Sequence, residues 1–282
     1  MAPTMKTLTL LMLALLCMLA LLTAPAGACA APTAASDIPA PTTKDWAAIA
    51  ALPDWSGVWI PDVVDQMKQA STNPPPWTPA AARKAAALVA QEQAGQPKGL
   101  FVDCLPEGLP SLMLITHNPV EFVFTPGRVL LLGESDGDRQ RRIYTDGRPH
   151  PANPDPTFFG HAIGHWEGGT LVVDTTGVLP ETYIAVSEAI GLPNNGDLHV
   201  VERIRLTAPD TLADDLTIEA PKVLSAPWKT TRLFYRHRER SAEIGEGVCL
   251  QGRFAEGVDK AGDAVFVPLQ FDADGSPIPP KS

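Results

Sequence analysis

Short apolar segments, separated at close intervals by glycine and proline turns, run through residues 120–236 of this chain. Val, Ile, Leu and Thr dominate the segments, and turns such as those at residues 125–127 and 167–169 lie between them. Tight turns between alternating segments are typical of β-hairpins. The 29 prolines among 282 residues also oppose long helices. The pattern predicts an antiparallel meander of about nine strands.

We expect this meander to close into a lipocalin-like barrel, or to fold into a sandwich, with a short helical appendage near the N-terminus. Thr78, Pro79 and the Ala-rich run that follows predict a helix near residues 79–94. One or two helical turns are expected at residues 45–52, and a short helix or lid at residues 181–190. No internal repeat or second boundary is visible, so residues 54–282 are predicted to form a single β-rich domain.

Residues 1–30 have the pattern of an export signal peptide. Lys6 precedes an apolar run at residues 8–22, and small residues with A-x-A cleavage sites follow. Cys29 lies in a degenerate lipobox, so a lipid anchor there is the less favoured alternative. Residues 31–53, rich in Ala, Pro and Thr, are predicted to be a flexible linker. The sequence thus predicts a periplasmic or secreted protein with no integral membrane segment after cleavage.

Cys104 and Cys249 are the only cysteines outside residues 1–30. An oxidising compartment favours a disulfide between them, and two free buried thiols are the alternative. The net charge of −10 argues against a nucleic-acid binder, which needs a basic face. No phosphate loop, dinucleotide fingerprint or Gly-x-Ser-x-Gly elbow occurs, so we expect no cofactor.

Two resemblances to known families are visible. Residues 57–59, Gly-Val-Trp, resemble the opening of lipocalin-type barrels, in which the Trp plugs the closed end. A broader resemblance is carried by RRIYTDGRPHP at residues 141–151 and GHAIGHWEGGTLVVDT at residues 160–175, with further matches at residues 116–122, 198–203 and 226–228. On these segments the chain resembles a family of uncharacterised exported bacterial proteins, although Gly169 stands where that family has Asp. The family has no assigned catalytic residues, so the resemblance implies export and no site.

Strand phase sorts the residues that can carry chemistry, because alternate residues of a strand share a face. At residues 198–206, Glu202 falls on the same face as Val200 and Ile204. A carboxylate on an apolar face either forms an internal ion pair or keeps a raised pKa as a general acid or base. The ion pair, with an arginine such as Arg142 or Arg232, is the favoured interpretation.

His161 and His165 share one face of the strand expected at residues 161–166. If that face points into the barrel, two imidazoles line its interior and can move protons near neutral pH; if it points outward, they are surface histidines. A metal ion shared by the two rings requires a helix, because on a strand they lie about 13 Å apart. Gly160 and Gly164 disfavour a helix, so we expect no metal site.

Tyr144 shares a strand face with Arg142, and Asp146 follows at the strand end, where it either takes part in chemistry or closes a turn with Arg148. The predicted catalytic residues are His165, His161, Tyr144, Glu202, Asp146 and His117. The predicted substrate-binding residues are Arg142, Tyr183, Trp166 and Phe124.

These groups predict a cofactor-independent acid/base enzyme of the lyase, isomerase or cyclase type, acting on a small, partly hydrophobic or amphipathic molecule in a barrel pocket. The alternative is a lipocalin-like carrier without catalysis, with outward-facing histidines and a lumen lined by Phe122, Phe124, Leu130, Leu132 and Ile204. A third interpretation is an envelope interaction protein, which predicts a filled core with His161 and His165 in solvent.

Overall fold

The structure, a computed structural model, describes residues 39–96, 100, 105–115, 119–134, 140–186 and 190–245, and four short strands beyond residue 253. The chain divides into two units, Met1–Ala40 and Pro41–Ser282, and nearly all of the described residues belong to the second. The predicted signal peptide, His117, Cys104 and Cys249 lie outside the described residues. The export signal and the disulfide therefore stay predictions.

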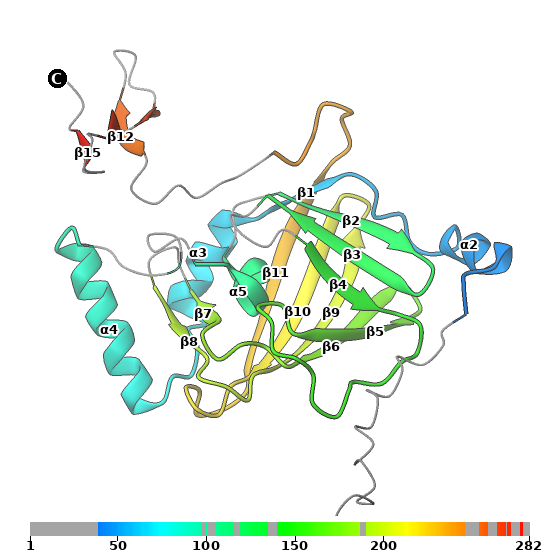
Figure 1. The fold of residues 1–282 in the computed structure, drawn as a ribbon, viewed down its shortest axis with the longest axis horizontal. Helices are drawn as coiled ribbons and strands as arrows, with labels where there is room; N and C mark the ends of the chain where they lie inside the picture. Colours follow the sequence, from blue (N-terminus) through cyan, green and yellow to red (C-terminus); the bar gives the residue numbers. More distant parts are fainter. Residues whose placement is uncertain are drawn as a thin grey trace, which may run out of the picture. The chain divides into compact units, whose positions relative to one another are not determined.

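Nine strands form a closed barrel (Figure 1). In hydrogen-bonding order they are β1 (Val58–Pro61), β11 (Trp228–His237), β10 (Thr211–Glu219), β9 (His199–Ala208), β6 (Thr170–Thr176), β5 (His161–Glu167), β4 (Gln140–Tyr144), β3 (Arg128–Gly133) and β2 (Val120–Thr125). Pairing of β2 with β1 closes the ring. The mainly β fold and the closed barrel predicted from the turn pattern are confirmed.

One strand pair departs from the predicted antiparallel meander. β4 and β5 are parallel, with Ile143 opposite Ala162 and Tyr144 opposite Ile163. A parallel pair requires a crossover connection of about a dozen residues or more, whereas an antiparallel pair can be joined by a tight turn. Residues 145–160 supply that connection, and their four prolines keep it extended instead of closing a hairpin.

Four helices are described: α2 (Thr43–Ile49), α3 (Val63–Thr72), α4 (Pro79–Gln93) and α5 (Gly108–Leu114). The predicted helix is confirmed in α4, where the Thr78 side chain accepts a hydrogen bond from the Ala81 backbone N–H and Pro79 occupies the first turn. α2 forms within the segment expected to make one or two helical turns. None of the helices among the described residues is both long enough and apolar enough to span a membrane.

Of the short helix or lid expected at residues 181–190, the helix is wrong at residues 183–185. This segment contributes β7 (Tyr183–Ala185), which pairs with β8 (Gly191–Pro193) in a small antiparallel sheet. Ser111 of α5 donates its hydroxyl hydrogen to the Tyr183 carbonyl at 2.7 Å and accepts from the Ala185 N–H at 3.3 Å. These tertiary hydrogen bonds hold the segment extended.

The two ends of the barrel are closed differently. At the α3 end, the backbone and side chains of β11 contact α3 and α5: Gln69 donates to the Thr231 carbonyl at 2.7 Å, and Arg232 donates to the Leu114 carbonyl at 2.8 Å. At the opposite, Trp55 end, the ring of Trp55 contacts those of Phe122, Phe124 and Trp166. Figure 1 places α2 on the side of the barrel away from α3 and α5.

Apolar side chains fill the interior between these ends. Trp59 is fully buried, donates its indole N–H to the Trp55 carbonyl at 3.0 Å, and carries the Arg236 guanidinium 4.5 Å above its ring. On β3, Val129 and Leu131 are buried, whereas Leu130 and Leu132 lie on the other face. The lumen that the carrier interpretation predicts is therefore wrong at Leu130 and Leu132, which strand alternation turns outward.

Candidate active site

Glu202 is fully buried inside the barrel and forms an ion pair, as its strand phase predicts, but its partner is Arg141. Arg141 Nη1 donates to one carboxylate oxygen at 2.8 Å, and Nη2 donates to the other oxygen and to Thr175 Oγ1 at 3.3 Å. The prediction that Arg142 is the partner is wrong. Arg142 is exposed and donates to Gln140 at 2.7 Å, because neighbouring residues of a strand face opposite ways. Arg232 is buried but donates to Leu114 and Gln69.

Asp214 is a second buried carboxyl group in the same interior. Burial, followed by the nearby Glu202 carboxylate, raises its pKa well above the ordinary 3.8, against the opposing effect of Arg141. Arg141, Glu202 and Asp214 are all fully buried. A substrate in contact with solvent does not reach these groups, so we assign them to the core and not to chemistry.

His161 and His165 lie on the outer face of β5. The alternate phase points inward: Ala162 is buried, and Trp166 packs against the core residues. Trp166 decides this phase, because its large ring packs edge-on against Trp55 and Phe124 at the Trp55 end. The possibility that two imidazoles line the barrel interior is therefore wrong, and the outward alternative is correct.

The outward phases of five neighbouring strands bring polar side chains together near the α3 end. Register places His161 of β5 opposite Thr176 of β6, and His199 of β9 opposite Glu219 of β10. Residues 145–160 add side chains from outside the sheet, and they are fixed to β6 by a hydrogen bond from the Thr157 N–H to the Gly177 carbonyl at 3.1 Å. We name the resulting group the outer cluster; it consists of Tyr144, Arg148, His150, His161, Asp174 and His199.

One hydrogen-bonded chain runs through the outer cluster. His161 Nδ1 lies 2.9 Å from His150 Nδ1, and His150 Nε2 lies 2.9 Å from Asp174 Oδ1. The second Asp174 oxygen lies 3.1 Å from His199 Nε2, and His199 Nδ1 lies 3.2 Å from Glu219 Oε2. Three imidazoles are thus linked in series through one carboxylate.

This geometry assigns the protons. Both nitrogens of His199 face carboxylates, so this position favours the protonated ring, which can donate from both nitrogens. Burial opposes that charge, but the hydrogen bonds to Asp174 and Glu219 outweigh it and raise the pKa of His199. His150 donates its Nε2–H to Asp174, so its Nδ1 accepts the Nδ1–H of His161. The Nε2 of His161 then carries a basic lone pair.

His161 is kept neutral by its surroundings. Burial, together with His150 and Arg148, lowers its pKa below the ordinary 6.5. Its ring stacks on Tyr144 with centroids 5.3 Å apart, and the Arg148 guanidinium lies 4.0 Å above the same tyrosine ring. A stack of cation, phenol and imidazole results.

Asp146 holds Arg148 in that stack. Its carboxylate accepts from Arg148 Nε at 2.9 Å and Nη2 at 2.6 Å, and also from the Arg148 backbone N–H at 3.2 Å. These hydrogen bonds lower the pKa of Asp146 and raise that of Arg148. The turn interpretation of Asp146 is confirmed: this carboxylate positions the arginine.

The other predicted site residues lie elsewhere. His165 is on the same face as His161 but is exposed and contacts Glu167 at 3.1 Å, which in turn accepts from Arg203 at 2.8 Å. Phe124 and Trp166 meet inside the Trp55 end. Tyr183 of β7 is partly buried against the core residues.

Sequence reasoning missed Arg148, His150, Asp174 and His199 as members of one site. A signal was present for His199, whose phase is opposite to that of Glu202 and therefore outward. Its neighbours across the sheet depend on strand register, which the local sequence does not contain. Within the described ranges, no three or more His, Cys, Asp or Glu side chains are placed to hold a metal ion.

No protein-family model matches this chain, and no curated protein matches it either.

Proposed function

We propose that the chain is an acid/base enzyme of the lyase, isomerase or cyclase type, and that its reaction takes place at the outer cluster. The observation that carries the proposal is the series of hydrogen bonds from His161 to His199, along which the surroundings lower the pKa of His161 at one end and raise that of His199 at the other. Titratable groups whose surroundings push their pKa values apart mark acid and base roles. The proposed site lies on the outer wall of the barrel instead of in its lumen.

His161 is the proposed base. Its Nε2 lone pair removes a proton from a carbon next to a carbonyl, and the C–H electron pair becomes part of a C=C bond as the carbonyl oxygen becomes an enolate. The resulting imidazolium is stabilised through His150 and the Asp174 carboxylate. Return of the proton to another carbon completes an isomerisation, and departure of a group from the β-carbon completes an elimination.

Arg148 and Tyr144 are proposed to bind the oxygen of the substrate. Asp146 holds the guanidinium against the tyrosine ring, so the cation is positioned before the substrate arrives. A fixed cation beside a neutral base suits a small molecule with a carbonyl or carboxylate group. About a fifth of the His150 side chain and two fifths of the Asp174 side chain are exposed, which leaves the site accessible.

The envelope-interaction interpretation fits His165, which is 66% exposed. It does not fit His161, which stacks on Tyr144 and forms a hydrogen bond with His150. A surface histidine without a role needs no such arrangement, and this difference between the two residues favours the enzyme.

Deuterium exchange tests the proposal. Proton NMR in D2O follows loss of the α-proton signals of 2-oxo acids, aldehydes and cyclic ketones. We expect the protein to accelerate exchange for at least one class, and His161→Gln to reduce the rate about 10²- to 10⁴-fold because the base is lost. His165→Gln is the matched control, since it alters the same face of the same strand, and it should leave the rate unchanged.

The pH profile gives a second measurement on the same reaction. Because the pKa of His161 is lowered, the rate should rise with pH along a limb centred below 6.5. If no compound in the three classes exchanges faster with the unmodified protein than with His161→Gln, the proposal is wrong.

A further inference from the structure

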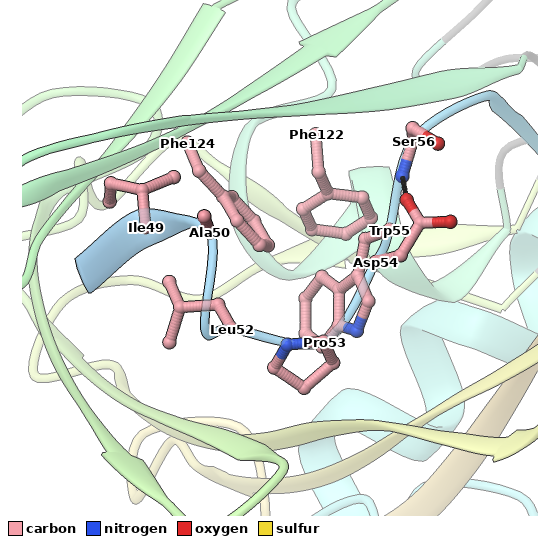
Figure 2. A pocket seen from close by; sticks show the side chains of 9 residues that line it. All are labelled: Ile49, Ala50, Leu52, Pro53, Asp54, Trp55, Ser56, Phe122 and Phe124. Carbon is pink, nitrogen blue, oxygen red and sulfur yellow. Dashed lines mark hydrogen bonds between the residues drawn. The ribbon is translucent and has the colours of Figure 1, made fainter. Parts of the chain in front are cut away.

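A cavity of about 310 Å³ lies at the Trp55 end of the barrel. Figure 2 shows the rings of Phe122, Phe124 and Trp55 grouped together, with residues of α2 and the following turn beside them. The complete lining is Ile49, Ala50, Leu52, Pro53, Asp54, Trp55, Ser56, Phe122 and Phe124. Ligand sites typically enclose about 300–1,000 Å³ and are mostly apolar, so this cavity suits a small molecule.

Aromatic rings form one wall of the cavity. Trp55 packs edge-to-face on Phe122, with centroids 5.0 Å apart, and on Phe124 at 5.5 Å. The ring of Trp166 also packs against Trp55, with centroids 5.3 Å apart. Trp55 and Phe122 are buried, and Phe124 is the ring of the three that stays partly exposed. A planar guest therefore meets Phe124, which the contacts with its neighbours hold in position without a ligand.

The single carboxylate in the lining is already engaged. Asp54 accepts from the Ser56 N–H at 2.9 Å, from Arg236 at 3.2 Å and from Arg238 at 3.4 Å. The Ser56 hydrogen bond and then the two arginines lower the pKa of Asp54 to about 2. A ligand therefore meets a carboxylate that already has hydrogen-bond partners. Its negative charge disfavours an anionic ligand, and a cationic ligand would need to displace two arginines.

The helix beside the cavity contacts β2 but is not buried against it. α2 has seven residues and a capping box between Thr42 and Asp45, yet none of its residues is buried. Helices this short are marginal without tertiary packing. Ile49 at its end lines the cavity, so a bound apolar molecule would give α2 more apolar surface against which to pack.

We propose that the Trp55 end binds a small, neutral ligand built on an aromatic or fused-ring framework, in contact with Phe122, Phe124 and Leu52. This site is independent of the outer cluster. The two lie at opposite ends of β5, because His161 begins the strand and Trp166 is next to its last residue, about 16 Å farther along at 3.3 Å per residue.

A pair of fluorescent probes with the same rings tests the charge and the shape of the site. N-phenyl-1-naphthylamine is neutral, and 8-anilinonaphthalene-1-sulfonate adds one negative group. Titration of the full chain should give saturable binding of the neutral probe, with affinity for the anionic probe at least about tenfold weaker because its sulfonate must be desolvated. Absence of saturable binding, or equal affinity for the two probes, would overturn the proposal.

Filling the cavity locates the probe. Ala50→Phe places a ring into the lining from an exposed position and should weaken binding of the neutral probe at least about tenfold by removing buried contact area. Ala47→Phe, on exposed α2 but outside the lining, is the matched control and should bind as the unmodified protein does. Equal affinity in both variants would place the probe elsewhere and refute the site.

Substitution in the outer cluster separates this site from the proposed enzyme activity. His161→Gln should keep the affinity for N-phenyl-1-naphthylamine while it slows proton exchange about 10²- to 10⁴-fold. Loss of probe binding in that variant would contradict the independence of the two sites.

Discussion

At the scale of single residues, two buried acids of the barrel interior, Glu202 and Asp214, lie near the Arg141 guanidinium, which forms hydrogen bonds with only one of them. Arg141 forms its ion pair with Glu202, and burial raises the pKa of Asp214. A buried charge is tolerated only with a partner or in its neutral form. Glu202 has the ion-pair partner and Asp214 has the raised pKa, so two buried carboxyl groups on neighbouring strands are accommodated in different ways.

Asp214 should make the stability depend on pH. The folded chain holds a proton that the unfolded chain releases above its ordinary pKa of 3.8. Its contribution is therefore complete below about pH 4 and declines as the pH rises toward the raised pKa of the folded state. Asp214→Asn removes this linkage, so its free energy of unfolding should exceed that of the parent by a margin that grows at about 1.4 kcal/mol per pH unit. Urea unfolding at several pH values measures the margin.

Asp215→Asn is the control for that experiment. Asp215 is the next residue on β10, faces outward, and contacts Arg205 and Thr231. Loss of this surface pair should change stability by only about 0–1 kcal/mol, without the growing margin expected for Asp214→Asn. Parallel pH profiles for the parent and Asp214→Asn would show that Asp214 is ionised in the folded state and that the assignment is wrong.

At the scale of elements, the crossover between β4 and β5 shapes the outer cluster. It carries Arg148 and His150 past the end of β4 and returns the chain beside β6, where Gly160 starts the final approach to His161. Gly160 has φ +64°, and an added Cβ would lie 2.4 Å from the Thr176 carbonyl oxygen. Its backbone therefore approaches β6 more closely than any other residue type allows.

Gly160→Ala should destabilise the protein more than Gly168→Ala does. Gly168, in the β5–β6 turn, has a similar φ of +60° but nothing within 4 Å of an added Cβ. Its substitution should cost about 1–2 kcal/mol for the left-handed backbone alone. Gly160→Ala should lower the free energy of unfolding by about 1–3 kcal/mol more than that, because the methyl group forces β6 to move. Denaturant unfolding compares the two, and equal losses would contradict the close approach.

The elements also differ in how well the sequence predicts them. The β2–β3, β5–β6 and β9–β10 hairpins follow from local turn chemistry, and α4 follows from its N-cap and proline. α5 was missed because all seven of its residues are buried, which leaves no polar face and no helical periodicity to detect. The helix predicted at residues 181–190 was wrong because Ser111, distant in sequence, holds that segment extended.

At the scale of the whole molecule, the barrel has two narrow seams. β1 meets β2 only at Val58 opposite Glu121 and Trp59 opposite Val120. β4 meets β5 only at the pairs formed by Ile143 and Tyr144. By contrast, β9 and β10 pair without a break from His199 opposite Glu219 to Leu206 opposite Leu212, and the register shifts only at the last pair, Ala208 opposite Thr211. The closed ring is therefore much less uniform than its strand order implies.

Hydrogen exchange should detect these seams. Short ladders open at a lower free energy than long ones, so amides of β1, β2, β4 and β5 that lie at the seams should exchange first. Those in the β9–β10–β11 ladders should exchange last, near the rate of global unfolding. Native-state hydrogen exchange at low denaturant gives the order, and equal protection at the seams and in β9–β10 would contradict it.

The sequence by itself determined the local hairpins and the start of α4, because these depend on residues close together in the chain. It placed Glu202 inside and His199 outside for the same reason. Only the tertiary structure decided that Arg141 is the partner of Glu202, that β4 and β5 are parallel, and that His150, His161, Asp174 and His199 meet. These contacts depend on register between strands joined by long connections, and register is set by how large side chains such as Trp55, Trp59 and Trp166 fill one closed interior.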